Sequence, residues 1–148
     1  MKAKGPIPPE LNVISGKVVE AAFAVHSALG PGLLESVYEI CLFHELQKQG
    51  LNVERQVSLP VIYDNLSLEE GFRLDMLVED SLVLELKAVD EILPVHLAQI
   101  LTYLKLSNRR LGLLINFNVT RIKDGIKRVA LKRFTTEAQR TQRFTENK

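Results

Sequence analysis

The sequence predicts a single α/β domain in which helices pack on a mixed β-sheet. Two observations carry this prediction. A chain of 148 residues, with 46% hydrophobic and 25% charged residues, has the length and balance of one globular domain around one core. The spacing of the apolar residues also changes along the chain, from a helical period to alternation and back. The predicted order is two helices, three strands, a helix, a strand and a polar tail.

The first part of the chain is predicted to be helical after a flexible start. Residues 1–12 are expected to form an N-terminal arm, because the first ten contain three prolines and one glycine. Ser15 is placed to cap a helix over about residues 15–29, where apolar residues recur at helical spacing. The Gly-Pro-Gly segment at 30–32 then interrupts the chain, and a second helix is predicted over about residues 33–49.

Three strands are predicted next, because apolar residues begin to alternate with polar ones. Residues 53–63 form the first of these strands, and Asp64-Asn65 marks a turn. Two runs rich in strand-forming residues, 72–78 and 82–89, follow. Only Glu79-Asp80-Ser81 separates them, so they are predicted to form a hairpin.

The last elements complete the predicted sheet and end in a tail. A helix is predicted over about residues 95–107. Residues 111–117 are almost all apolar, as in a strand that is covered on both faces. Residues 126–134 fit either a last strand or a short helix. The domain is therefore expected to span residues 13–134, and residues 135–148 are expected to form a polar, mobile tail.

Composition and motifs exclude several classes of protein. No apolar run reaches the ~18–20 residues of a membrane span, and the first ten residues lack the apolar stretch of a secretory signal. A single cysteine, Cys41, excludes an intrachain disulfide and a cysteine-rich zinc module. No Walker-type phosphate loop, dinucleotide-binding glycine motif or serine nucleophile elbow is present. We therefore expect a cytoplasmic protein with no membrane contact.

Charge is unevenly distributed along the chain. Residues 1–120 carry 10 basic and 15 acidic residues, whereas residues 121–143 carry 8 basic and 2 acidic residues. The basic segment has the composition of one that contacts phosphates, and the alternative, favoured for its last dozen residues, is a solvated, partly frayed tail. Both interpretations stay open at this stage.

The charges within two predicted strands indicate a functional site. Glu85 and Lys87 share one face of an otherwise apolar run, and Asp75 is the lone charge in another. Burying such groups without partners is costly, so they need an explanation. If Val78 pairs with Leu82 across a three-residue loop, Asp75 lies opposite Glu85; a two-residue loop separates them.

Two carboxylates held side by side repel each other, and both stay ionised if a cation lies between them. Carboxylate oxygens suit Mg²⁺ or Mn²⁺, and the backbone carbonyl of Leu86 is placed to add a third ligand. Lys87 would then orient or deprotonate a water, or stabilise charge on a phosphate. The alternative is a buried ion pair of Lys87 with Asp75 or Glu85, which the spacing alone leaves open.

Polar residues on two predicted helices are further candidates for the site. Glu35 starts the second helix, and Tyr38 follows on the same face. His96, Gln99 and Tyr103 form a polar stripe on the later helix, opposite its apolar one. The alternatives are that Glu35 only favours the positive end of the helix dipole, and that the stripe is a solvated face.

The ordered set of motifs resembles a known group of enzymes. Asp75, ten residues before Glu85-x-Lys87, resembles the core motif of the PD-(D/E)XK nuclease superfamily. Residues 32–38, Gly-Leu-Leu-Glu-Ser-Val-Tyr, match the signature of the GxxExxY protein family, and segments at 94–99, 101–105 and 111–117 are also similar to that family. The resemblance runs from about Val13 to Val129 and implies a restriction-endonuclease-like mixed sheet flanked by helices.

The resemblance also implies roles for the candidate residues. Asp75 and Glu85 would be metal ligands, Lys87 the catalytic lysine, and Glu35 the helix-borne acidic residue that completes such sites. Gln99 and Tyr103 would position the substrate, with His96 and Tyr38 as further candidates for that role. The implied function is a Mg²⁺- or Mn²⁺-dependent nuclease acting on DNA rather than RNA, working as a homodimer or beside a partner protein. A catalytically silent module that binds nucleic acid or protein is the alternative.

Overall fold

The computed structural model describes residues 6–131, and the elements within them follow the predicted order closely. This part of the chain contains three α-helices, one short 3₁₀ helix and five strands. Their bounds, in chain order, are α1 (Pro9–Leu29), α2 (Glu35–Lys48), β1 (Val53–Tyr63), β2 (Leu66–Val78), β3 (Leu82–Lys87), α3 (Pro94–Ser107), β4 (Leu111–Asn116), η1 (Ile122–Gly125) and β5 (Ile126–Ala130).

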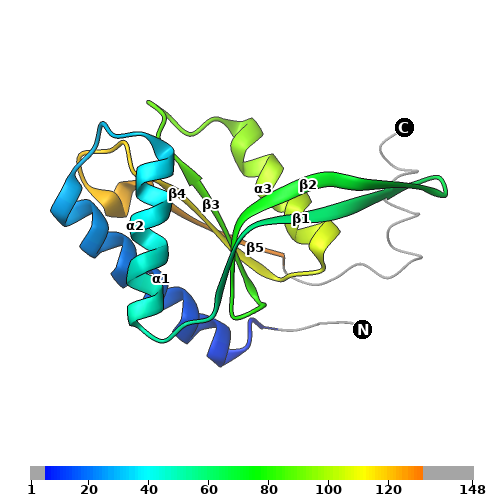
Figure 1. The fold of residues 1–148 in the computed structure, drawn as a ribbon, viewed down its shortest axis with the longest axis horizontal. Helices are drawn as coiled ribbons and strands as arrows, with labels where there is room; N and C mark the ends of the chain where they lie inside the picture. The colour runs from blue at the N-terminus through cyan, green and yellow to red at the C-terminus, as the bar shows by residue number, and fades with distance from the viewer. Residues whose placement is uncertain (1–5, 132–148) are drawn as a thin grey trace.

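The strands of the described residues form one mixed sheet in the order β1-β2-β3-β4-β5 (Figure 1). The strands β1, β2 and β3 pair antiparallel, β3 pairs parallel with β4, and β4 pairs antiparallel with β5. Antiparallel neighbours can be joined by short turns, whereas a parallel pair needs a longer crossover, which α3 supplies here. The mixed sheet that the apolar spacing predicts is therefore confirmed.

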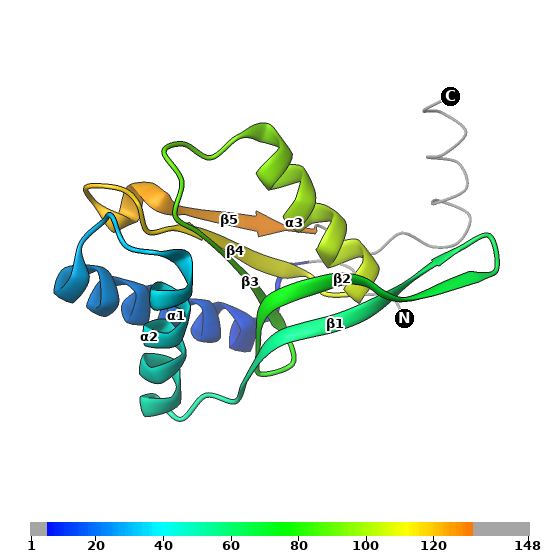
Figure 2. The same cartoon turned by 45° about the horizontal axis from the view of Figure 1, so that its top comes forward.

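Helices cover both faces of the sheet, α1 and α2 on one face and α3 on the other (Figures 1 and 2). On β3, Leu82, Leu84 and Leu86 pack with the two N-terminal helices, while Val83 packs on the opposite face with Ile100 of α3. Because β3 is covered on both faces, the buried Glu85 has no open solvent face to occupy and must find partners inside the fold. Lys87, at the end of the strand, is only half-buried.

The N-terminal helix begins earlier than the sequence predicts. α1 starts at Pro9, inside the segment expected to be a flexible arm, and not at Ser15. Proline at the first helical position has the backbone angle that a helix needs and lacks only an N–H that would be unpaired there anyway. Leu11 adds a buried side chain to this first turn. Ser15 is itself buried within the helix, and its hydroxyl donates to the Asn12 carbonyl at 3.1 Å, so it is not a cap.

The hairpin formed by β1 and β2 is longer than predicted. β2 begins at Leu66 and not at residue 72, and the pairing runs outward to Tyr63↔Leu66. Asp64 and Asn65 join the strands and both have positive φ, 49° and 68°, as in the tight turns that match the twist of a hairpin. The outer half of the hairpin projects beyond the rest of the described chain (Figure 2).

The end of the described chain settles one open alternative. Residues 126–130 form the strand β5, paired with β4, and not a helix. The predicted continuation of this element to residue 134 and the predicted tail at 135–148 lie outside the described residues. Between residues 6 and 131 no helix has both the length and the apolar character needed to cross a membrane.

Candidate active site

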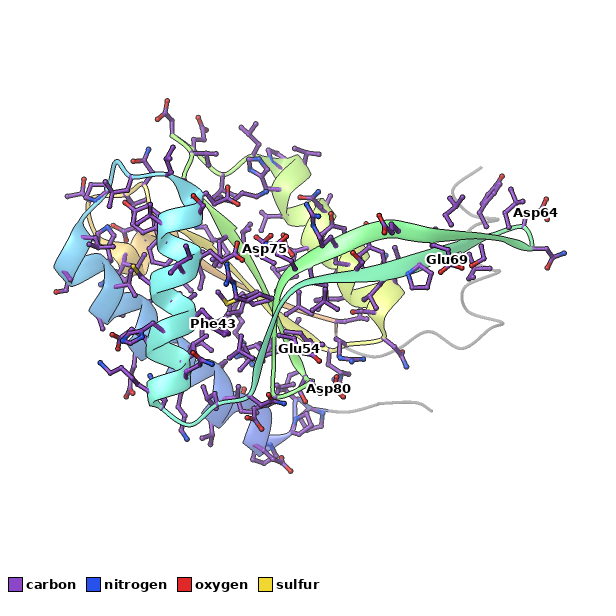
Figure 3. All side chains as sticks on the ribbon, viewed as in Figure 1. Phe43, Glu54, Asp64, Glu69, Asp75 and Asp80 are labelled. Carbon is purple, nitrogen blue, oxygen red and sulfur yellow. The ribbon has the colours of Figure 1, made fainter. Side chains whose placement is uncertain are left out.

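The candidate site lies where β2 and β3 separate. The ladder between these strands consists of Met76↔Leu84, Leu77↔Val83 and Val78↔Leu82, across the three-residue loop 79–81. This is the pairing that the sequence required for the two carboxylates to meet. Asp75 and Glu85 follow directly after the last rung, at the point where the hairpin leaves the sheet; Figure 3 shows Asp75 there, near the middle of the molecule.

Each of the two carboxylates binds the backbone of the other strand. Glu85 accepts a hydrogen bond from the Asp75 backbone N–H at 3.2 Å, and Asp75 accepts one from the Leu86 backbone N–H at 2.8 Å. These bonds take the place of ladder bonds at the point of separation. Glu85 is only 5% exposed, so its carboxylate depends on partners inside the fold. The two carboxylates are thereby held side by side by the backbone.

Burial and mutual repulsion make this pair difficult to ionise together. Burial, followed by the charge of Asp75, raises the pKa of Glu85 from its usual 4.5 to about 8. Burial also raises the pKa of Asp75, although its bond from the Leu86 N–H works in the opposite direction. Removing two such charges from water without a compensating cation is unfavourable, so the pair retains a proton near neutral pH or accepts a cation.

Glu35 and Lys87 complete a group of four charges. Glu35 is the first residue of α2. Partial burial and the charge of Asp75 raise its pKa, while the charge of Lys87 lowers it. Lys87 also lowers the pKa values of Asp75 and Glu85, so its positive charge acts on all three carboxylates. The structure thus brings together the four residues that the sequence selected as catalytic.

The end of β3, which carries Lys87, is held by its neighbour strand. Lys87 pairs with Asn116 of β4, and its backbone carbonyl accepts a hydrogen bond from the Phe117 N–H at 2.9 Å. The Asn116 side chain, which is 2% exposed, binds the backbone of Val89 through both its oxygen (3.0 Å) and its nitrogen (2.9 Å). Asn116, a polar residue at the end of an apolar strand, was the available sequence signal for these hydrogen bonds, and our sequence reasoning missed it.

The donor groups fit a hard divalent cation. Asp75 and Glu85 supply carboxylate oxygens, and the Leu86 peptide lies directly against Asp75 through its N–H. Among residues 6–131 no three aspartate, glutamate, histidine or cysteine side chains converge on one metal position. A cation at this place would therefore rest on two carboxylates, with backbone oxygen or water as its remaining ligands.

A groove beside Lys87 contains three of the predicted substrate-positioning residues. Its volume is about 590 Å³, and it is lined by Lys87, Val95, His96, Ala98, Gln99, Thr102 and Tyr103. Gln99 donates a hydrogen bond to the Tyr103 hydroxyl at 3.0 Å. Burial and the charge of Glu85 raise the pKa of Tyr103. The groove therefore opens next to the charged group.

Two contacts of α3 argue against the alternative that its polar stripe is only a solvated face. Tyr103 is half-buried and packs on Phe72 of β2, with ring centroids 5.0 Å apart, so this member of the polar stripe is not on a solvated face. His96 accepts a hydrogen bond from the Leu93 backbone N–H through Nδ1 at 2.9 Å, which caps the start of α3. One ring nitrogen of His96 thus has a structural partner while the side chain lines the groove.

Tyr38 is not brought to the charged group. Its side chain is fully buried, and its ring stacks on Phe117 at a centroid distance of 4.6 Å. Its hydroxyl donates to the Gly30 carbonyl and accepts a hydrogen bond from the Leu33 N–H at 3.1 Å. Tyr38 therefore fixes the loop that leads to Glu35, and the geometry gives it no contact with a substrate.

Glu39 is a buried residue near the site that our sequence reasoning missed. It lies one helical turn after Glu35 and is 7% exposed. Its charge contributes to the raised pKa values of both Asp75 and Glu35. Like charges four residues apart on a helix repel each other, so the Glu35–Glu39 pair was an available signal that this helix face is not merely solvated.

Comparison with known proteins places the chain in a family. No curated protein and no solved structure matches it. The PD-(D/E)XK nuclease superfamily matches residues 12–129, which is most of the chain. This range includes β1 to β4, α2, α3, most of α1 and of β5, and the four charged residues of the site. The mixed sheet with helices on both faces agrees with the restriction-endonuclease-like fold of that superfamily. The chain therefore belongs to the PD-(D/E)XK nuclease superfamily.

Proposed function

We propose that this protein is a nuclease that hydrolyses phosphodiester bonds in DNA rather than RNA, with Mg²⁺ or Mn²⁺ as its cofactor. The observation that carries the proposal is the carboxylate pair Asp75 and Glu85, each hydrogen-bonded to the backbone of the other's strand where β2 and β3 separate. The charges of Lys87 and Glu35 act on both carboxylates. Carboxylates on adjacent strands and a lysine on one of them are the groups that metal-assisted hydrolysis of a phosphodiester requires. Membership of a nuclease superfamily supports the same conclusion.

Asp75, Glu85 and the backbone carbonyl of Leu86 would hold the cation. When bound, the cation polarises a phosphate oxygen and lowers the pKa of a coordinated water. Lys87 orients the attacking water or neutralises charge on the phosphate, because its ammonium group lies within electrostatic reach of both carboxylates. Glu35 approaches from the start of α2 and adds a third carboxylate that can accept a proton from water or bind it.

The groove on α3 would receive the nucleic acid strand. Gln99 and Tyr103 form a hydrogen-bonded pair there, and His96 lies in the same lining. These groups would position the substrate next to Lys87. Tyr38 would act indirectly, by fixing the loop that presents Glu35.

Within the superfamily, we assign the chain to the GxxExxY group. The three named positions of that signature have separate roles in the fold, which supports the assignment. Gly32 has φ 99°, a conformation that favours glycine. Glu35 starts α2 and joins the charged group, and Tyr38 anchors the preceding loop from the core.

A cleavage assay tests the proposal. Purified protein is incubated with supercoiled DNA, single-stranded DNA and RNA, each with Mn²⁺ or with EDTA, and wild type is compared with Lys87→Ala. Lys17→Ala, which removes an exposed lysine on α1, is the matched control. We expect cleavage of DNA by wild type and by Lys17→Ala in Mn²⁺ only, and none by Lys87→Ala.

A catalytically silent module is the second candidate function. The observation in its favour is the acidic balance of residues 1–120, which repels nucleic acid outside the groove. Binding of nucleic acid or of a partner protein, without cleavage of any substrate in Mn²⁺, would support this alternative over the nuclease.

A further inference from the structure

One residue of β1 has a backbone conformation that side chains other than glycine rarely adopt. Gln56 has φ 53° in the middle of the strand. The ladder between β1 and β2 contains Arg55↔Met76 and Val57↔Leu74 but passes over Gln56 and Asp75. Gln56 and Asp75 therefore occupy the same step of the hairpin, and the regular pairing is interrupted at that step.

The interruption changes which face each strand buries. On β1, Val53 packs in the core of α1 and α2, whereas Val57, beyond Gln56, packs in the core of α3. On β2, Met76 packs with α1 and α2, and Leu74 packs with α3. Such an irregularity re-aims the side chains around it. The orientation of Asp75, which lies between Leu74 and Met76, consequently depends on the conformation of Gln56.

The Glu39 side chain, on α2, binds the side chains of Gln56 and of its neighbour Arg55. Both of its carboxylate oxygens accept hydrogen bonds from the Gln56 side-chain amide nitrogen, each at 3.0 Å. Arg55 donates to Glu39 at 3.1 Å, and its guanidinium lies 5.2 Å from the centre of the Phe43 ring. A left-handed conformation is strained for a residue with a side chain and persists only where its surroundings impose it. The buried Glu39 carboxylate thus binds Gln56 and Arg55 from α2.

We propose that Glu39 is a positioning residue: it fixes the left-handed conformation of Gln56 and thereby orients Asp75 toward Glu85 and the Leu86 amide. Glu39 itself touches neither substrate nor reacting atoms. This inference rests on the proposed nuclease function for its catalytic readout. Its structural readout, the bond from the Leu86 N–H to Asp75, is independent of that function.

A compensating substitution distinguishes positioning from simple packing. Glycine adopts positive φ without strain, so Gln56→Gly needs no partner to keep its conformation. If Glu39 acts by holding Gln56, Gln56→Gly should relieve the defect of Glu39→Ala. A packing defect at Glu39 would instead be unchanged or made worse by the second substitution. The Arg55 side chain is 37% exposed and can turn to solvent in the double variant.

The experiment measures hydrogen exchange of the Leu86 amide by NMR in EDTA, and cleavage rates in Mn²⁺, for wild type, Glu39→Ala, Glu39→Gln and Glu39→Ala/Gln56→Gly. Glu45→Ala, which removes an ion-paired carboxylate elsewhere on α2, is the control. In Glu39→Ala we expect exchange of the Leu86 amide about 10-fold faster. We also expect kcat about 100-fold lower, with KM for DNA little changed. The double variant should recover most of both losses.

The outcomes separate this inference from the proposed function. Absence of cleavage by wild type would overturn the nuclease function, and the exchange of the Leu86 amide would still decide the role of Glu39. Unchanged Leu86 exchange in Glu39→Ala, or a loss that Gln56→Gly does not restore, would overturn the positioning role. If Glu39→Ala does not fold, Glu39→Gln, which keeps the side-chain volume, and Glu39→Gln/Gln56→Gly give the same comparison.

Discussion

The two halves of the β1–β2 hairpin are both paired antiparallel, with a shift of register between Leu59 and Val61, but their surroundings are very different. In the inner half, Leu74, Met76 and Val78 are fully buried between helices. In the outer half, Ile62 and Tyr63 are 66% and 70% exposed. Figure 3 shows Asp75 where the hairpin leaves the sheet, and Asp64 and Glu69 along the projecting end. Backbone pairing makes both halves strands, but only side-chain packing fixes the position of a strand relative to the rest of the fold. The candidate site lies at the boundary between the packed inner half and the exposed outer half.

The largest expected difference concerns stability. Met76→Ala should lower the free energy of unfolding by about 2–5 kcal/mol, because it leaves a cavity in a core that cannot fully collapse. Ile62→Ala, in the outer half, should change it by less than about 0.5 kcal/mol. Urea unfolding of both variants measures the contrast. Equal losses of unfolding free energy in the two variants would show that the outer half is packed in solution as the inner half is, and would contradict the difference drawn between them.

Metal binding should stabilise the folded protein only through the carboxylates at the inner half of the hairpin. Adding Mn²⁺ at 100 times its dissociation constant should raise the free energy of unfolding by about 2.7 kcal/mol, since a ligand that binds only the folded state stabilises it by mass action. EDTA should remove the gain, and Asp75→Asn should abolish it. Thermal unfolding with and without Mn²⁺ gives the result. A gain that persists in Asp75→Asn would mean that the cation binds elsewhere.

The pH dependence of the free energy of unfolding should show that Glu85 has a raised pKa. Burial and the charge of Asp75 raise the pKa of Glu85 from 4.5 to about 8. Between these pH values the folded protein keeps a proton that the unfolded chain has released, so the folded state loses stability as the pH rises. In EDTA at pH 8, Glu85→Gln should therefore be more stable than wild type by about 2 kcal/mol or more.

This advantage of Glu85→Gln should shrink toward zero as the pH falls to 5, where wild-type Glu85 is protonated as well. Urea unfolding at several pH values provides the measurement. Glu45→Gln, on α2, is the control for losing a carboxylate outside the site. A stability gap that does not change between pH 5 and pH 8 would contradict the assigned direction of the shift.

The smallest expected effect lies at the tip of the hairpin. Asn65 has φ 68°, which asparagine tolerates better than alanine does. Asn65→Ala should lower stability by about 1 kcal/mol or less, and it should leave the exchange of the Leu86 amide unchanged. Hydrogen exchange along both strands tests this. Faster exchange at Leu86 in Asn65→Ala would show that the two halves of the hairpin are coupled.

The parts of the fold that the sequence predicted are those where burial imposes a pattern. The apolar stripes of the helices and the apolar run at 111–117 predicted these elements correctly, because one face of each helix and both faces of β4 pack in a hydrophobic core. The facing of Asp75 and Glu85 followed from a loop of three residues, since side chains alternate strictly across a strand. These inferences needed only local spacing.

The features that the sequence did not reveal depend on contacts that leave no periodic signal. The outer part of β2, residues 66–71, is polar or exposed, so backbone bonds hold it without a hydrophobic pattern. The left-handed Gln56 depends on Glu39, 17 residues earlier in the chain. Tyr38 matched a motif, but only the structure shows that its hydroxyl points into the core and binds the Gly30 loop.

The three-residue loop at 79–81 also constrains how this chain can vary over evolutionary time. Deleting or inserting a single residue there would reverse the facing of every residue of β2 relative to β3, and Asp75 would no longer meet Glu85. Adding residues in pairs beside Asp64 and Asn65, at the opposite end of the hairpin, would only lengthen a segment that already projects. Relatives of this protein should therefore differ in length at the outer turn and agree in length at the inner one.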